Sequence, residues 1–318
     1  MKKMIAVLIS LTLLVSSLLC GGAFADENAL SVVTTIFPIY DWTREIAGDK
    51  IDLTMLLDSG VDLHSFQPTA ADIMKIATCD VFIYVGGESD EWVEDALKEA
   101  VNPNMKVLSL VELMGEDIKL EELVEGMESD EDEEEEDEEE ADEHVWLSLR
   151  NARKLSAAIA AALGEADPSN ADDYAANAAA YAEKLDALDA EYADVAENAA
   201  FSTVLFGDRF PFRYLADDYG LNYYAAFSGC SAESEASFET IAFLAGKVDE
   251  LGLPVVLTIE GANHRIAETI VQTTRDKNQK ILVMDSMQAT TGQAVASGVT
   301  YLSVMQGNLA ALAEALAR

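Results

Sequence analysis

The sequence predicts an α/β protein of two lobes, each with a parallel β-sheet flanked by helices, joined by one long rigid helix. Short runs rich in β-branched residues alternate with amphipathic segments on both sides of residue 167, and this order is typical of parallel sheets covered by helices. A helical pattern of about thirty residues without an internal Gly separates the two series and predicts a rod of roughly 45 Å. Because open α/β sheets bind ligands at the carboxyl ends of their strands, we expect the site in the cleft between the lobes.

The first lobe is expected over residues 26–166. Pro38 favours the start of a helix that ends at Gly48, and Thr69 with Asp72 forms the capping box of a later helix. The predicted strands of this lobe are 31–37, 51–57, 81–85 and 106–110, and an acidic insert over 128–143 follows them. The lobe then resumes with a strand-like segment over 144–149 and a helix over 151–163.

The linking helix is predicted over residues 167–199 and the second lobe over residues 200–318. The linking helix carries one continuous apolar stripe, formed by Tyr174, Tyr181, Leu185, Leu188, Tyr192 and Val195. The second lobe repeats the order of the first. Its predicted strands are 202–206, 223–227, 255–259 and 281–284, and its predicted helices are 212–219, 238–251, 262–275 and 300–317.

The charge of the chain favours a cationic ligand. The formal net charge is −39 at pH 7, which disfavours binding to nucleic acid or to an anionic membrane surface. Of the sixteen residues 128–143, fourteen are Asp or Glu, and a block this dense is expected to be a solvated loop. It is either a solubilising insert or a loop that collects divalent cations and delivers them to His144, which follows it directly.

The amino-terminal segment predicts export. Residues 1–25 combine a basic start, an apolar stretch and an A-x-A cleavage site. An alternative is lipid anchoring to the membrane through Cys20, although Leu18 and Leu19 make a poor lipobox. Cleavage would leave Cys79 and Cys230, too few for a disulfide framework, and the sequence alone explains no role for Cys230.

Four side chains at predicted strand ends could hold a metal ion. They are His64, His144, Asp208 and Asp285, two from each lobe. Two imidazoles and two carboxylates suit zinc or manganese.

The sequence offers two alternatives to Asp208 as the third ligand. Glu260 and His264 follow the strand predicted over 255–259 and could replace or supplement Asp208. Arg209 cannot coordinate a cation, and we expect it to turn away and pair with a carboxylate such as Asp217 or Asp218.

The chain resembles the metal-binding subunits of bacterial ABC importers, the cluster 9 (cluster A-I) zinc and manganese binding proteins. The resemblance covers essentially the whole mature chain. It is carried by Val-Thr-Thr-Ile-Phe-Pro-Ile-Tyr at 33–40, His-Ser-Phe-Gln-Pro-Thr at 64–69 with Asp72, the charged insert before His-Val-Trp-Leu at 144–147, the long central helix, and Gly-Val-Thr-Tyr-Leu-Ser-Val-Met at 298–305.

That resemblance implies two lobes that hinge little about the helix, with the metal between them. It implies His64 and His144 as the first two ligands. The third ligand of the family is usually His or Glu, and this sequence offers Asp208 there; the fourth falls on Asp285. The insert is usually histidine-rich in the zinc members of that family, whereas here its ligand side chains are carboxylates only.

The leading functional hypothesis is a non-enzymatic, monomeric receptor outside the cytoplasm that binds Zn²⁺ and delivers it to an ABC permease. A manganese receptor of the same type is the first alternative. A secreted metal-dependent hydrolase is an alternative from another class, but the sequence contains no H-E-x-x-H or G-x-S-x-G pattern. A third is an adhesive or calcium-buffering surface protein that acts through the acidic loop.

Overall fold

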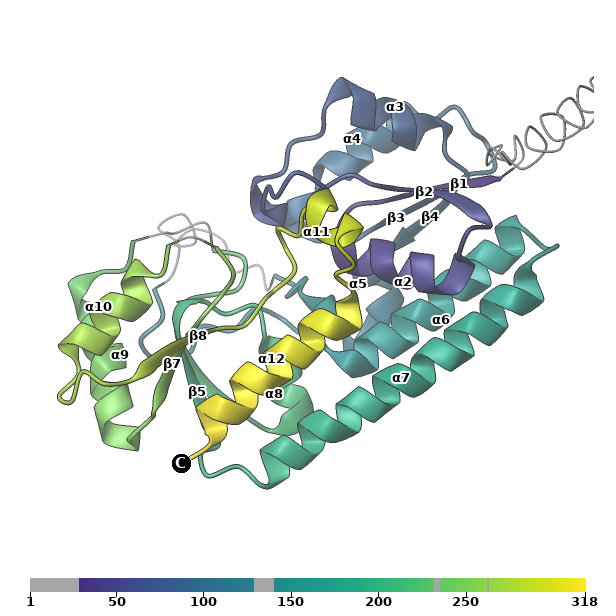
Figure 1. The fold of residues 1–318 in the computed structure, drawn as a ribbon. Coiled ribbons are helices and arrows are strands. Elements are labelled where there is room, and N and C mark those ends of the chain that lie inside the picture. The colour runs from purple at the N-terminus through teal and green to yellow at the C-terminus, as the bar shows by residue number, and fades with distance from the viewer. Residues whose placement is uncertain (1–28, 129–139, 232–234, 262) are drawn as a thin grey trace, which may run out of the picture.

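The computed structural model describes residues 29–128, 140–231, 235–261 and 263–318. These residues form two lobes, each built on a four-stranded parallel sheet (Figure 1). The predicted leader over residues 1–25, with Cys20, lies outside the described residues, and so does most of the acidic insert. In the described part of the chain, no helix is both long and apolar enough to cross a bilayer.

The first sheet has the strand order β2-β1-β3-β4, and every pairing is parallel. Its strands lie close to the predicted ranges: β1 (Leu30–Thr34), β2 (Ile51–Met55), β3 (Val81–Tyr84) and β4 (Lys106–Ser109). Parallel strands at the centre of such a sheet are covered on both faces, and Val81, Phe82 and Ile83 of β3 are all fully buried.

Helices cover both faces of the first sheet, with α3 and α4 on one side and α2 and α6 on the other (Figure 1). They are α2 (Phe37–Ala47), α3 (Ala70–Thr78), α4 (Trp92–Lys98), the short α5 (Leu110–Met114) and α6 (Leu149–Ala166). Pro38 lies in the first turn of α2, and Gly48 ends that helix with a φ of +62°. The capping box of Thr69 and Asp72 at the start of α3 is confirmed.

The segment predicted as a strand over residues 144–149 is instead a turn of 3-10 helix, η5 (Val145–Leu147). All three of its side chains are fully buried, so it lacks the alternation between buried and exposed positions that marks a half-buried strand. The Ser148 side chain accepts a hydrogen bond from the Asn151 amide and begins α6 at once. No length of chain is left for a strand, and periodicity alone does not separate such short apolar runs.

The long helix α7 (Ala171–Glu197) passes beneath both lobes (Figure 1). It packs against α6 and α2 of the first lobe and against helices of the second lobe. Of the predicted apolar stripe, five side chains are buried: Tyr174, Tyr181, Leu185, Leu188 and Tyr192. At 27 residues, the helix is about 40 Å long.

The second sheet has the order β6-β5-β7-β8 and is also parallel. Its strands are β5 (Thr203–Arg209), β6 (Asn222–Phe227), β7 (Val255–Thr258) and β8 (Lys280–Val283). Strand β5 is longer than predicted, because an irregularity in its pairing with β6 between Phe206 and Arg209 extends it. Asp208 therefore lies within the strand rather than after it.

Helices flank the second sheet in the same way, with α9 (Phe238–Leu251) and α10 (Arg265–Thr273) packed together on one side. The others are α8 (Arg213–Tyr219), the short α11 (Gly292–Ala296), which the sequence did not predict, and α12 (Tyr301–Leu316).

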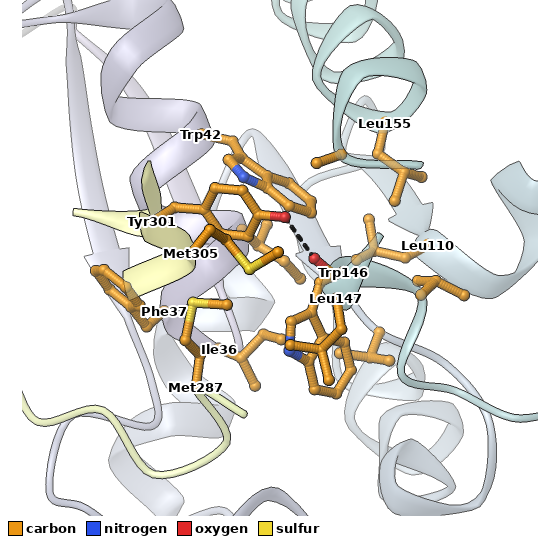
Figure 2. Close-up of a cluster of buried hydrophobic side chains, with 14 of the residues drawn as sticks. Ile36, Phe37, Trp42, Leu110, Trp146, Leu147, Leu155, Met287, Tyr301 and Met305 are labelled. Carbon is orange, nitrogen blue, oxygen red and sulfur yellow. Dashed lines mark hydrogen bonds between the residues drawn. The ribbon is translucent and has the colours of Figure 1, made fainter. Parts of the chain in front are cut away.

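Helix α12 is a second connection between the lobes, because its start is anchored in the core of the first lobe (Figure 2). The Tyr301 amide donates to Asp41 Oδ2 at 2.7 Å, and its hydroxyl donates to the Trp146 carbonyl at 2.7 Å. The Trp42 and Tyr301 rings meet edge to face with centroids 5.2 Å apart. From the second lobe, the Ser286 carbonyl accepts a 2.8 Å hydrogen bond from Trp146 Nε1. The residues just beyond His144 are thus fixed by both lobes.

Candidate metal centre

His64 lies in the connection after β2, in the short 3-10 helix η1 (Leu63–Ser65). The Asp62 side chain caps this turn, and its Oδ1 accepts a hydrogen bond from the His64 amide at 3.1 Å. Because the cap fixes the backbone of the turn, it also fixes the direction of the imidazole that the turn carries.

His144 is fully buried and lies between the acidic insert and η5. Asp142 Oδ1 accepts from the His144 amide and lies 2.9 Å from its Nδ1. The other side of the ring packs against Trp146, with ring centroids 5.2 Å apart. A carboxylate on one ring nitrogen orients the imidazole and leaves the other nitrogen available as a ligand.

The two imidazoles meet between the lobes. His64 Nε2 lies 3.3 Å from His144 Nε2. Each ring uses its Nδ1 elsewhere: His144 Nδ1 faces Asp142, and His64 Nδ1 lies 2.7 Å from Ser89 Oγ, which donates to Glu143. This network assigns the proton of each ring to Nδ1, so that two Nε2 lone pairs face one another.

The separation of these two nitrogens fits a single metal ion. Two nitrogens bound to one tetrahedral zinc ion at 2.0–2.1 Å lie about 3.3–3.4 Å apart. The observed 3.3 Å matches that spacing, and a cation between the lone pairs would relieve their repulsion.

Burial and neighbouring charges set the protonation of this centre. Burial, with the neighbouring His144, lowers the pKa of His64 to about 3, so this imidazole is neutral at physiological pH. Burial opposes a charge on His144 as well, but the hydrogen bond and charge of Asp142 raise its pKa. Burial raises the pKa of Glu143 to about 7.

The thiol of Cys230 lies close to the two histidines. Within the described residues, two groups of His, Cys, Asp and Glu have ligand atoms within 4.8 Å of one another: His64 with His144 and Cys230, and Glu121 with Asp142 and His144. Cys230 Sγ also lies 3.6 Å from Glu143 Oε1. Burial, with the charge of Glu121, raises the pKa of the Cys230 thiol.

Gln288 is a further neighbour that the sequence analysis missed. It comes from the second lobe and is buried, and its Nε2 lies 3.2 Å from His64 Nε2. Cys230 and Gln288 both lie a few residues beyond predicted strands, so the strand-end rule that selected the other candidates could have found them.

Asp208 and Asp285 belong to neither group. Asp208 Oδ2 accepts from Thr258 Oγ1 at 2.6 Å and from the Ile259 amide at 3.4 Å, so this carboxylate ties β5 to β7. Asp285 Oδ1 accepts from the Met287 amide at 2.8 Å. Both carboxylates thus have partners in the second lobe.

The comparison with known families decides what this centre belongs to. Residues 32–315 match the family described as "Zinc-uptake complex component A periplasmic". The chain belongs to this family. The resemblance to metal-binding subunits of ABC importers is therefore confirmed, and the family is one of transport components rather than of enzymes.

Relatives within the zinc-uptake family share much of the chain. The zinc-binding protein AdcA of Streptococcus pyogenes serotype M3 is 30% identical over 90% of this chain and 56% of AdcA, so the chain spans about half the length of that relative. The high-affinity zinc uptake system protein ZnuA of Bacillus subtilis is 31% identical over 93% of this chain and 90% of its own length. The crystal structure of the Zn(II)-bound ZnuA-like domain of Streptococcus pneumoniae AdcA has a TM-score of 0.73 at 30% identity, covering 92% of this chain and all of that one. The predicted two-lobed fold is confirmed.

The two alternative ligands of the second lobe have other contacts in this member of the zinc-uptake family. Glu260 accepts hydrogen bonds from the amide and hydroxyl of Ser286 and, at 3.2 Å, from the Gln288 amide, so it shapes the loop that carries Gln288. Burial and the charge of Asp285 raise the pKa of Glu260 to about 7. His264 Nδ1 lies 3.2 Å from Thr258 Oγ1.

The expected pairing of Arg209 with Asp217 or Asp218 is wrong. The Arg209 guanidinium forms an ion pair with Asp62 of the first lobe. Asp217 pairs with Lys119, and Asp218 with Arg150. The extension of β5 carries Arg209 to the boundary between the lobes, where Asp62 is the nearer carboxylate.

Proposed function

We propose that this protein is an exported receptor that binds one zinc ion between its lobes and delivers it to an ABC permease. The observation that carries the proposal is the separation of 3.3 Å between the Nε2 atoms of His64 and His144. These nitrogens come from two separate segments of the first lobe and point to one position, and a carboxylate or a hydroxyl holds the far side of each ring. His64 and His144 are the first two ligands in this proposal.

Zinc is favoured over manganese as the transported ion. Two imidazoles and a nearby thiol suit zinc, and the general order of affinities places zinc above manganese. The relatives at about 30% identity are named for zinc, which weighs in the same direction.

Delivery to a permease and the place of action rest on similarity and on sequence. ZnuA of B. subtilis, of which the chain covers 90%, is named as a component of a high-affinity zinc uptake system. Residues 1–25 support export, with anchoring through Cys20 as the alternative. We assign residues 26–166 and 200–318 to the two lobes and 167–199 to the linking helix, and we expect a monomer.

Metal analysis and competitive titration test the proposal. Protein purified without added metal should contain about one equivalent of zinc. After metal removal, zinc should bind more tightly than manganese, and His64→Ala should abolish the tight site. A tight site with equal or higher affinity for manganese would make the protein a manganese receptor, and the absence of any tight site would overturn the receptor function.

A further inference from the structure

We propose that the thiolate of Cys230 is the third ligand of this metal site. The inference rests on the proposed function, because it concerns the same ion. It replaces Asp208, the ligand that the sequence analysis favoured, and gives the site two imidazole nitrogens and one sulfur.

The position of Cys230 supports this assignment. Its Sγ forms a group with one ring nitrogen from each of His64 and His144, and the three atoms lie within 4.8 Å of one another. Ligand atoms of one tetrahedral zinc ion are about 3.3–3.8 Å apart, given Zn–N of 2.0–2.1 Å and Zn–S of about 2.3 Å. A small movement of the thiol would therefore close the site around an ion. The Asp208 carboxylate, in contrast, accepts a hydrogen bond from the Thr258 hydroxyl of β7.

The loop that carries Cys230 is built to approach the histidines closely. Gly229 lies against the His144 ring, and a Cβ on this residue would come within 2.9 Å of His144 Cε1. Any other side chain would push the loop away from the imidazole, because real Cβ contacts are not that short. On the other side of Cys230, Arg209 Nη1 donates to the Ser231 carbonyl at 3.3 Å. The Cys230 amide donates to Glu121 Oε1 at 3.2 Å.

A second, independent observation points to a ligand at this place. Gln288 is buried to 1% exposure, its Nε2 lies 3.2 Å from His64 Nε2, and its Oε1 has no hydrogen-bond partner in the described part of the chain. Glu143 is equally buried, and its Oε2, which lies against Gly87, is also without a partner among these residues. Its other oxygen, Oε1, lies 3.4 Å from His64 Nδ1 and 3.6 Å from Cys230 Sγ. A buried carboxylate without a full set of partners is costly. A divalent cation bound beside it would offset part of that cost.

Coordination by Cys230 exchanges one bond for another. The S–H bond breaks, a Zn–S bond forms, and one proton leaves for each zinc ion bound. Glu143 accepts the S–H hydrogen bond in the metal-free protein, and the released proton passes to solvent. A soft thiolate also raises the preference of the site for zinc over manganese, because manganese prefers hard oxygen donors.

Substitutions of Cys230 in the full chain test the proposal, made in a parent protein that carries Cys20→Ala and keeps Cys79 and Cys230 as its two cysteines. Cobalt(II) bound to the parent protein should show a thiolate-to-metal charge-transfer band in the near ultraviolet. Cys230→Ser should lose this band and bind zinc roughly 100-fold or more weakly, the share of one ligand in a zinc site. Cys230→Asp should narrow the preference for zinc over manganese. The matched control is Cys79→Ala, because Cys79 is buried beneath the end of α3 and donates to the Ile76 carbonyl.

The outcomes separate this inference from the proposed function. If the parent protein binds zinc tightly and Cys230→Ser keeps both the affinity and the cobalt spectrum, the receptor stands and Cys230 is not a ligand. If Asp208→Asn weakens zinc binding more than Cys230→Ser does, Asp208 is the third ligand. If the parent protein binds no zinc tightly, the receptor function fails. Circular dichroism of each variant shows whether a loss of binding is a loss of fold.

Discussion

Arg209 of the second lobe forms an ion pair with Asp62 of the first, with Nη2 and Oδ2 2.7 Å apart. The other carboxylate oxygen of Asp62 caps the turn that carries His64. The other terminal nitrogen of Arg209 donates to the Ser231 carbonyl, next to Cys230. One guanidinium therefore connects the His64 turn with the Cys230 loop across the boundary between the lobes. Both groups are largely shielded from water, with side-chain exposures of 14% for Arg209 and 27% for Asp62.

Removing this ion pair should weaken zinc binding without unfolding the protein. Arg209→Met leaves the Asp62 carboxylate unpaired and frees the Cys230 loop, so we expect zinc to dissociate faster and to bind about 10- to 100-fold more weakly, the range seen for residues that orient metal ligands. Stopped-flow transfer of zinc to a chelator measures this rate.

Arg153→Met is the matched control for Arg209→Met. Arg153 pairs with Asp186 on the surface, where both side chains are more than half exposed, and such pairs contribute little. The zinc dissociation rate of this variant should equal that of the parent. An equal effect of both substitutions would show that the loss comes from net charge rather than from the contact across the lobes.

Substitution of either proposed ligand histidine should weaken zinc binding far more than substitution of His264, the third histidine of the chain. His64→Ala and His144→Ala should each remove tight zinc binding, because each takes away one of the two converging nitrogens. His264→Ala should change the affinity by less than about tenfold, since His264 contacts Thr258 rather than the histidine pair. Isothermal titration with zinc, alongside circular dichroism, measures both effects. Normal binding by a folded His144→Ala variant would make His144 a structural residue.

Asp142 should act on zinc affinity through the orientation of His144. Its Oδ1 lies 2.9 Å from His144 Nδ1. Asp142→Ala removes that acceptor and should cost about 10- to 100-fold in zinc affinity. Asp142→Asn keeps an oxygen acceptor without its charge, so it should bind zinc between the parent and the alanine variant. If the Ala and Asn variants bind equally, the charge rather than the hydrogen bond matters.

The sequence was sufficient to predict the architecture, because both lobes follow simple periodic rules. Pro38 and the Thr69 capping box begin helices where they were expected to, and the apolar stripe of α7 is buried. His64 and His144 could be chosen because histidine is rare in this chain and both lie beside predicted strands.

The remainder of the site depends on contacts that no local pattern reports. Strand β5 continues through Asp208 because of an irregular pairing with β6, which residues of β5 alone do not reveal. The segment after His144 was expected to be a strand because its apolar run is too short to distinguish strand from helix. The approach of Cys230 to His144 depends on Gly229 packing against the imidazole, a contact between segments 85 residues apart in the chain.

The acidic insert should affect the capture of zinc more than its final affinity. Its ends are held in place: the Glu128 amide donates to the Ala226 carbonyl, and the Glu121 amide donates to the Glu140 carbonyl. Surface charges attract ions, but salt screens them beyond roughly 8 Å at physiological ionic strength. Replacing each Asp and Glu of 129–139 by Asn and Gln should slow zinc association severalfold at low salt and change the equilibrium constant little.

Stopped-flow association at several salt concentrations tests the role of the insert. A variant in which each Glu of 129–139 is replaced by Asp keeps the charge and should retain the parent rate. A large loss of equilibrium affinity in the neutral variant would show instead that the insert supplies a ligand.

Asp90 should make the metal-free protein less stable as the pH rises from about 4 to about 6. It is 3% exposed and accepts from the amides of Val85 and Gly86, yet burial raises its pKa from 3.8 to about 6. The folded state therefore keeps this proton in a range where the unfolded state has lost it. The contribution of Asp90 to the free energy of unfolding is highest below pH 4 and falls, by an amount on the order of 2–3 kcal/mol, until the pH passes the folded pKa.

Asp90→Asn isolates this contribution, because the amide does not titrate and all other carboxylates stay the same. The difference in the free energy of unfolding, parent minus variant, should become smaller or more negative between pH 4 and pH 6 and stay constant above pH 7. Urea denaturation in the presence of a chelator at four or five pH values measures it. A difference that does not change with pH would mean that Asp90 titrates like an exposed carboxylate, because only a raised pKa in the folded state links its proton to folding.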